Sequence, residues 1–219
     1  MNIGLDIDEV LLRLLDAFIL YHNQTYGTRV VKDDFRSYSF EEAVGGSKEE
    51  MKQKVLHFYT TPYFENIQPV PGSQQGIAKL AEPDRIIGSP NSPTERKNSL
   101  YVITARAARI KDQTKRSLAH HFPDRFSGLE LTDQWFGTST EKPRLKSSIC
   151  VDKNIEVMVE DSLTQALDCA AAGIHVLLLD LGYGWNQTSE KLPENIKRAH
   201  SWEEIVAEID SYGKKHGRG

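Results

Sequence analysis

The fold is decided by residues 1–10, MNIGLDIDEV, in which an apolar run carries two aspartates, Asp6 and Asp8. Apolar runs of this kind are typical of a buried parallel strand. A buried carboxylate without a partner is costly, so we expect Asp6 at the carboxyl end of the strand, facing a cation, donors or solvent. In a straight strand the two aspartates would lie about 6.6 Å apart, so they can share a metal ion only if the chain turns after Asp6.

The composition limits the class of protein. The chain has 219 residues, 39% of them hydrophobic, which is enough for one domain with a sizeable core or for a core with a small cap. There are 27 basic and 31 acidic residues, a net charge of −4, and no basic stripe, which argues against a nucleic acid polymer as partner.

The sequence also predicts a cytoplasmic protein that does not act on a membrane. No stretch approaches the roughly 20 apolar residues of a membrane span. Asp6 and Asp8 interrupt the first apolar run, so no signal peptide fits. Cys150 and Cys169 are expected to be buried free thiols, as in a reducing compartment.

A mostly helical segment follows the first strand. Helices are expected at 11–26, 47–60 and 74–81, and Ser47 with Glu50 forms a capping box at the start of the second. Residues 83–99 are rich in Pro, Ser and Asn, which predicts a long loop with a short extended piece at 85–88.

Strands and helices alternate in the rest of the chain. Strands are expected at 100–103, 129–131, 156–159, 175–179 and, at an edge, 196–199, with helices at 110–122, 146–154, 162–172 and from a cap at Ser201. This alternation implies right-handed crossovers and therefore an α/β fold with a parallel sheet.

Polar groups of particular types stand at the ends of these strands. They are Asp6 and Asp8 after the first strand, Thr104 after the second, Glu160 and Asp161 after the fourth, and Lys146 at the start of the helix before the fourth. The carboxyl ends of parallel strands meet at one edge of a sheet, so we expect these groups around one crevice. Crowded carboxylates repel each other unless a cation neutralises them, and oxygen donors favour Mg²⁺. A lysine and a hydroxyl can then hold a second anion, such as phosphate.

Taken in order, four segments resemble the motifs of the haloacid dehalogenase-like (HAD) phosphohydrolase superfamily. They are Asp6-Ile-Asp8-Glu-Val10, Ile103-Thr104-Ala-Arg106, Lys146, and Glu160-Asp161-Ser162. The segments HHFP at 120–123 and GWN at 184–186 point to the 5′(3′)-deoxyribonucleotidase-like branch, the cytosolic type C nucleotidases. The resemblance covers most of the chain outside the insert and the 83–99 loop.

The resemblance implies the architecture. It predicts a doubly wound parallel sheet with strand order 3-2-1-4-5, a HAD Rossmann-like core formed by residues 1–10 and 82–219. Residues 11–81 would then be a small helical cap, inserted after strand one, that closes over the site and contacts the leaving group.

The resemblance also implies a metal-dependent nucleophile. Asp6 would attack phosphorus to form an aspartyl-phosphate and would bind Mg²⁺. Asp8 would protonate the leaving oxygen and then activate water, while its backbone carbonyl binds the metal. Asp161 would complete the metal shell, and Glu160 is a weaker candidate for it.

Three further residues would hold the phosphoryl group. Thr104 and the backbone amide of Ala105 would bind it, and Lys146 would neutralise it and orient Asp6.

Arg106 is more readily explained as a structural ion-pair partner than as a substrate contact. Glu9 departs from the pattern, because the superfamily usually has a small residue there, often glycine.

The predicted function is Mg²⁺-dependent hydrolysis of a small phosphate ester, foremost a nucleoside 5′- or 3′-monophosphate. The alternatives are a sugar-phosphate phosphatase or phosphomutase of the same superfamily, or a non-catalytic ligand-binding member, for which Glu9 is the warning sign. Two other classes of protein fit the sequence less well. A 2-haloacid dehalogenase would need neither Asp8 nor a metal shell, and a receiver domain would lack the helical insert after the first strand. Exposed cap aromatics would allow a homodimer.

Two sets of aromatic residues could either pack in the core or contact a ligand. We expect them to pack in the core rather than to stack on a base or contact a ligand. The residues concerned are Phe35, Tyr38, Phe40, Phe58 and Tyr59 of the cap, and Trp135, Trp185 and Trp202.

Overall fold

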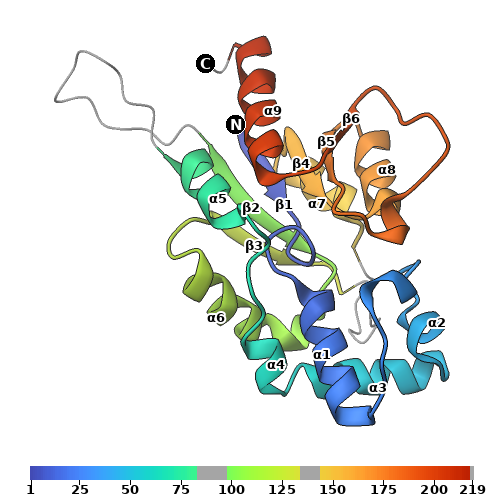
Figure 1. The fold of residues 1–219 in the computed structure, drawn as a ribbon. Coiled ribbons are helices and arrows are strands. Elements are labelled where there is room, and N and C mark those ends of the chain that lie inside the picture. Colours follow the sequence, from blue (N-terminus) through green and yellow to red (C-terminus); the bar gives the residue numbers. More distant parts are fainter. Residues whose placement is uncertain (83–97, 134–143, 218–219) are drawn as a thin grey trace.

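The structure is a computed structural model that describes residues 1–82, 98–133 and 144–217. Within these residues the sheet has six parallel strands in the order β3-β2-β1-β4-β5-β6 (Figure 1). The strands are β1 (Asn2–Leu5), β2 (Ser99–Thr104), β3 (Gly128–Leu131), β4 (Val157–Glu160), β5 (His175–Leu179) and β6 (Ile196–Ala199). The predicted α/β class and strand order are confirmed, and β6 lies at the edge as expected.

Helices cover both faces of the sheet. One face carries α5 (Ser73–Ala81), α6 (Lys111–His121) and α9 (Trp202–Lys215), and the other carries α7 (Lys146–Asp152) and α8 (Leu163–Ala171). Side chains alternate along a strand, so Val157 and Val159 join the first core and Met158 joins the second. Cys150 and Cys169 lie in the second core as buried free thiols, as predicted.

Four helices between β1 and β2 form a separate group at the carboxyl end of β1 (Figure 1). They are α1 (Leu14–Tyr26), α2 (Phe40–Val44), α3 (Lys48–Phe58) and α4 (Pro62–Glu65), with a short 3₁₀ turn, η1 (Lys32–Asp34). Phe18 packs at their centre, with the rings of Phe35, Phe40 and Phe58 at 6.4, 5.1 and 5.6 Å. The predicted capping box is present, because Ser47 Oγ accepts from the Glu50 amide and Glu50 Oε2 accepts from the Ser47 amide.

The third helix predicted for the cap, at 74–81, packs mainly against the core rather than against the other cap helices. Helix α5 packs against α9 and β2, on the face of the sheet. Gly76 allows this close approach, because a Cβ atom there would lie 2.4 Å from Cε3 of Trp202. We therefore propose that the cap ends before α5, instead of extending through residue 81.

Two chain segments connect the cap to the core, and they pair with each other. The Arg13 amide donates to Gln68 O at 2.9 Å, and the Val70 amide donates to Leu11 O at 2.9 Å. Leu12 forms an antiparallel bridge with Pro69 between these two bonds. Residues 11–13 thus belong to the linker, and the helix predicted from residue 11 begins only at Leu14.

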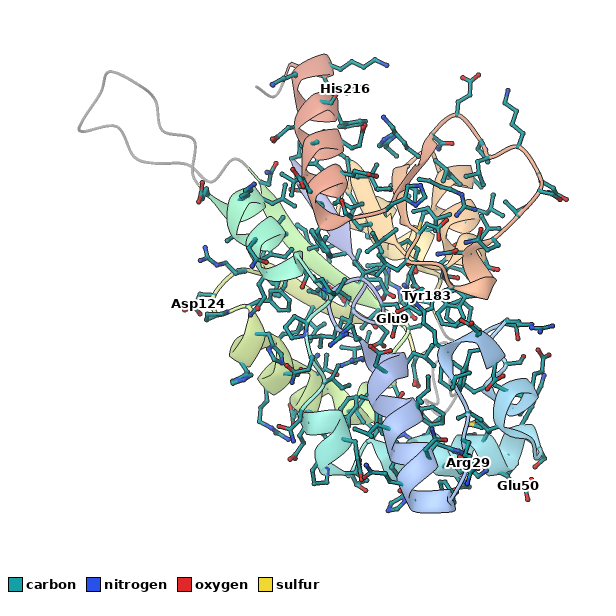
Figure 2. All side chains as sticks on the ribbon, in the orientation of Figure 1. Glu9, Arg29, Glu50, Asp124, Tyr183 and His216 are labelled. Atoms are coloured by element: carbon teal, nitrogen blue, oxygen red, sulfur yellow. The ribbon has the colours of Figure 1, made fainter. Side chains whose placement is uncertain are left out.

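Glu9 shapes the turn between β1 and this linker. Its φ of 61° lies in the left-handed region, where glycine is usual. The side chain offsets the strain, because Glu9 Oε1 accepts from the Leu15 amide at 2.7 Å, in the first turn of α1, and Oε2 accepts from the Tyr183 hydroxyl. Figure 2 shows Glu9 and Tyr183 together where the sheet meets the cap. The expected glycine-like position is therefore filled by a helix-capping carboxylate.

The loop predicted at 83–99 and its extended piece at 85–88 lie, up to residue 97, outside the described residues. The same is true of Trp135. Among the helices that are described, none combines the length and apolarity needed to cross a bilayer.

We expect Gly76→Ala to destabilise the protein although alanine favours helix. The gain in helix propensity is about 1 kcal/mol, whereas forcing a methyl group into a packed core costs about 1–3 kcal/mol. Urea unfolding should show a net loss of roughly 1 kcal/mol. Gln75→Ala, an exposed change in the same helix, should stay within about 0.5 kcal/mol of wild type. A stabilised Gly76→Ala protein would contradict the packing of α5 on Trp202.

We expect Glu9→Gln to reduce the pH dependence of stability. Burial raises the pKa of Glu9 from 4.5 to about 7, against the opposing hydrogen bonds from Leu15 and Tyr183. Between these values the folded protein keeps a proton that the unfolded chain has released, so the contribution of Glu9 to stability falls as pH rises from 4.5 through 7. Unfolding free energies at pH 5, 6 and 7 should therefore decline less in Glu9→Gln. The control is Glu194→Gln, which changes an exposed residue. If the unfolding free energy fell equally with pH in wild type, Glu9→Gln and Glu194→Gln, the raised pKa of Glu9 would be contradicted.

Candidate active site

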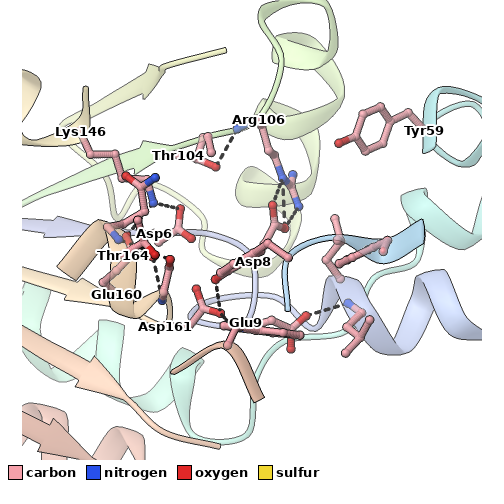
Figure 3. Close-up of a pocket in the computed structure, with 18 residues that line it drawn as sticks. Asp6, Asp8, Glu9, Tyr59, Thr104, Arg106, Lys146, Glu160, Asp161 and Thr164 are labelled. Carbon is pink, nitrogen blue, oxygen red and sulfur yellow. Dashed lines mark hydrogen bonds and ion pairs between the residues drawn. The ribbon is translucent and has the colours of Figure 1, made fainter. Parts of the chain in front are cut away.

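The ends of β1, β2 and β4 surround a cavity of about 330 Å³ between the sheet and the cap. The structure brings every predicted site residue to its wall: Asp6, Asp8, Thr104, Ala105, Lys146, Glu160 and Asp161 (Figure 3). The chain turns directly after Asp6, because the amides of Leu11 and Leu12 both donate to Ile7 O. The two aspartates of the first segment can therefore face one cavity.

Lys146 is buried between two carboxylates. Its Nζ lies 2.9 Å from Asp6 Oδ1 and 2.6 Å from Glu160 Oε2, and the residue is 1% exposed. Burial opposes the charge on Lys146, but the carboxylates of Asp6 and Glu160 raise its pKa above the ordinary value. Lys146 is therefore a fixed cation beside Asp6, and Glu160 is its anchor.

Three carboxyl groups meet at the strand ends. One oxygen each of Asp6, Glu160 and Asp161 lies within 4.8 Å of the others, and all three residues are buried. Oxygen atoms at this spacing suit a hard divalent cation, foremost Mg²⁺. The charge balance also favours a cation. Among the described residues, the cavity is lined by five carboxyl groups and two cationic side chains: Asp6, Asp8, Glu9, Glu160 and Asp161 against Lys146 and Arg106.

Burial and mutual repulsion drive these carboxyl groups towards their neutral forms. Burial raises the pKa of Asp6 to about 7, which Lys146 partly offsets and Glu160 and Asp8 reinforce. Burial, with Glu160 and Asp6 close by, also raises the pKa of Asp161 well above its ordinary value. A divalent cation would relieve this repulsion and allow these groups to ionise.

Arg106 clamps Asp8. Its Nε lies 3.0 Å from Asp8 Oδ2 and its Nη2 lies 2.6 Å from Oδ1, so two donors hold the carboxylate at once. Nη1 donates to Thr114 Oγ1 of α6 at 3.3 Å, and the guanidinium lies 5.1 Å from the ring centre of Phe64 in the cap. The ion-pair interpretation of Arg106 agrees with this geometry, and its partner is a predicted catalytic residue.

Thr104, the last residue of β2, and Ala105 line the same cavity. Thr104 is 1% exposed, and its Oγ1 accepts from the Arg106 amide at 3.3 Å. A hydroxyl that accepts one bond can still donate its own proton to a further acceptor. Thr104 and Ala105 can therefore offer a hydroxyl and a backbone amide to an anion in the cavity, which Lys146 also lines.

The cap supplies an apolar wall. Phe35, Phe40, Phe58 and Tyr59 pack in the cap core as expected, and Phe40 and Tyr59 also line the cavity beside Leu14. Tyr38 lines the cavity too but is 36% exposed, so the expectation that it packs in the core is wrong. Trp185 of η3 (Gly184–Asn186) packs against the core as expected, and its indole N–H also donates to Asp161.

Sequence reasoning missed the site contacts of Tyr38, Trp185 and Glu9. No periodic pattern marks them, since each lies in a turn or irregular segment. Two signals were available: the GWN segment, which contains Trp185 and follows β5 by a few residues, and the presence of Glu9 where the superfamily often has glycine.

Solved structures of similar fold are HAD-superfamily proteins. A haloacid dehalogenase-like hydrolase from Streptococcus pneumoniae has 17% identity and a TM-score of 0.61, covering 95% of this chain and 97% of that one. A HAD family hydrolase from Deinococcus radiodurans with bound phosphate and sodium has 15% identity and a TM-score of 0.61, covering 97% and 96%. A HAD hydrolase from Bacillus subtilis bound to magnesium has 16% identity and a TM-score of 0.59, covering 95% and 98%. These likenesses show the fold.

Sequence comparison identifies the branch. No curated protein matches the chain. A family model described as 5′ nucleotidase, deoxy (pyrimidine), cytosolic type C protein matches residues 1–212, nearly the whole chain. The four ordered motifs and the HAD fold agree with that match. The chain therefore belongs to the cytosolic type C 5′-nucleotidase family of HAD-like phosphohydrolases.

Proposed function

We propose that this protein hydrolyses small phosphate monoesters, with a nucleoside monophosphate as substrate. The observation that carries the proposal is the convergence of Asp6, Lys146 and Asp161 at one sheet edge in a chain of the nucleotidase family. The bound phosphate of the Deinococcus radiodurans relative supports the same class of ligand.

Asp6 is the proposed nucleophile, and Lys146 holds its carboxylate in place. A phosphoryl group that enters the cavity meets the Thr104 hydroxyl, the Ala105 amide and Lys146 on one wall. Asp6 attacks phosphorus, the bond to the leaving oxygen breaks, and an aspartyl-phosphate forms. Water then attacks this phosphorus and regenerates Asp6.

Asp8 is the proposed proton carrier. It gives a proton to the leaving oxygen in the first step and takes one from water in the second. Arg106 sets the direction of its carboxylate through two donors, which makes Arg106 a positioning residue.

Asp6 and Asp161, with Glu160 beside them, are the proposed holders of Mg²⁺. The Asp8 backbone carbonyl is a further proposed ligand. When bound, the ion supplies positive charge that offsets repulsion between the carboxylates and the phosphate. The magnesium-bound Bacillus subtilis relative supports this choice of metal.

The apolar wall favours a leaving group that carries a flat aromatic ring. Leu14, Phe40 and Tyr59 line the cavity from the cap, and Figure 3 shows Tyr59 on the side away from Lys146. The base of a nucleoside can pack against such side chains, whereas a sugar phosphate has no aromatic ring to place there. Structural neighbours named phosphoglycolate phosphatase and β-phosphoglucomutase keep those substrates as the second candidates.

The decisive experiment is a phosphate-release screen with MgCl₂ over nucleoside 5′- and 3′-monophosphates, sugar phosphates, phosphoglycolate and p-nitrophenyl phosphate. We expect the highest kcat/KM on nucleoside monophosphates and loss of turnover with EDTA. Preference for a sugar phosphate would replace the nucleotide proposal, and no turnover on any ester would leave the non-catalytic alternative.

We expect Asp6→Asn to lower kcat by at least about 10⁴-fold, because an amide cannot form the covalent intermediate. The folded state should persist, as checked by circular dichroism. Asp16→Asn, which changes an exposed carboxylate paired with Arg13, should keep wild-type turnover. Substantial activity in Asp6→Asn would exclude Asp6 as the nucleophile.

We expect Arg106→Met to affect poor leaving groups most. A nucleoside leaving oxygen needs a proton, which general acid catalysis supplies at about 10²–10⁴-fold, whereas p-nitrophenolate needs none. The ratio of kcat on a nucleoside monophosphate to kcat on p-nitrophenyl phosphate should therefore fall about 10-fold or more. Arg198→Met removes a partly buried arginine paired with Asp180 at 2.9 Å, outside the cavity, and should leave the ratio unchanged. An equal fall on both esters would mean that Arg106 is only structural.

A further inference from the structure

Asp161 accepts hydrogen bonds from two side chains that the proposed reaction does not use. Tyr38 Oη donates to Asp161 Oδ2 at 2.8 Å, and Trp185 Nε1 donates to the same oxygen at 2.7 Å. Tyr38 lies in the cap between η1 and α2, and Trp185 lies after β5. One carboxylate oxygen therefore links the end of β4 to the cap and to a second loop of the core.

Packing fixes the direction of these donors. The Trp185 ring stacks on Tyr183 at 4.5 Å with an interplanar angle of 9°, and it contacts the Tyr38 ring at 4.9 Å. Tyr183 is held in turn, because its hydroxyl donates to Glu9 and Lys32 Nζ lies 3.8 Å from its ring centre. The indole N–H is thus aimed at Asp161 by a stack that both cap and core support.

These donors are the specific partners of Asp161 in this structure. Asp6 and Glu160 share the cation of Lys146, but no ion pair within residues 1–82, 98–133 and 144–217 involves Asp161. Both donors bind Oδ2, which orients the carboxylate and leaves Oδ1 for another ligand. Carboxylates that bind metals are commonly held by such outer partners, whose loss weakens metal affinity by about 10- to 100-fold.

We propose that Tyr38 and Trp185 are positioning residues for the divalent cation, and that Tyr38 couples cation binding to the position of the cap. The inference rests on the proposed function, because it takes Asp161 as a metal ligand. Coupling between two events is reciprocal, so the cap position that places Tyr38 on Asp161 also raises the affinity for Mg²⁺.

The test is the affinity of the metal-free protein for MgCl₂, measured by isothermal titration calorimetry without substrate. Tyr38→Phe keeps the ring, which is 36% exposed, and removes only the hydroxyl. We expect its Kd for Mg²⁺ to rise about 10-fold, and Trp185→Phe, which removes the N–H, to give a similar rise. Tyr63→Phe is the matched control, since its hydroxyl bonds Gln24 within the cap, and it should bind Mg²⁺ as wild type does.

Hydrogen–deuterium exchange tests the coupling separately from affinity. At saturating MgCl₂, exchange in residues 32–40 should slow in wild type and in Tyr63→Phe, but not in Tyr38→Phe. Unchanged or tighter Mg²⁺ binding by Tyr38→Phe would overturn the inference while leaving the proposed function standing. If wild type itself bound no Mg²⁺, the metal site of the proposed function and this inference would both fail.

Discussion

The structure depends on one buried ion triad, in which Lys146 lies between Asp6 and Glu160. Moving an ion out of water costs several kcal/mol even after relaxation, so a buried lysine persists only when close carboxylates offset that cost. Glu160 provides a permanent partner, since it too is fully buried in β4. Lys146 therefore stays charged while its contact with Asp6 changes during a reaction. The same contact joins α7, β1 and β4, so packing and chemistry impose one geometry.

The excess of acidic over basic side chains at the cavity destabilises the folded protein, but it suits the proposed function. Asp6, Glu9 and Asp161 all have raised pKa values, chiefly because burial disfavours their charged forms. A chain selected for stability alone would gain from replacing such groups by apolar ones. In the proposed function, these acids beside a lysine and a threonine would bind a cation and an anion together. Asp6, Glu160 and Asp161 are buried, which strengthens the electrostatic interactions among them.

The sequence was sufficient for the elements that follow a repeating pattern. Apolar runs predicted β1, β2 and β5, and parallel topology then placed Asp6, Thr104 and Asp161 at one edge without any tertiary information. The family resemblance added the strand order. What could not be predicted depends on how irregular segments approach one another. The close packing of α5 on α9 rests on the lack of a side chain at Gly76, and the role of Glu9 rests on a left-handed turn that its neighbours do not signal.

The paired linkers between cap and core limit how the two parts can separate. Hydrogen bonds from Arg13 to Gln68 and from Val70 to Leu11 make the two connections a single short ribbon. A ribbon of two bonded strands bends far more easily across its flat face than in its own plane, and its strands cannot slide without breaking those bonds. The four cap helices therefore cannot shift along the core without breaking backbone hydrogen bonds. The backbone, and not only the side chains that line the cavity, consequently holds the cap in register with the sheet.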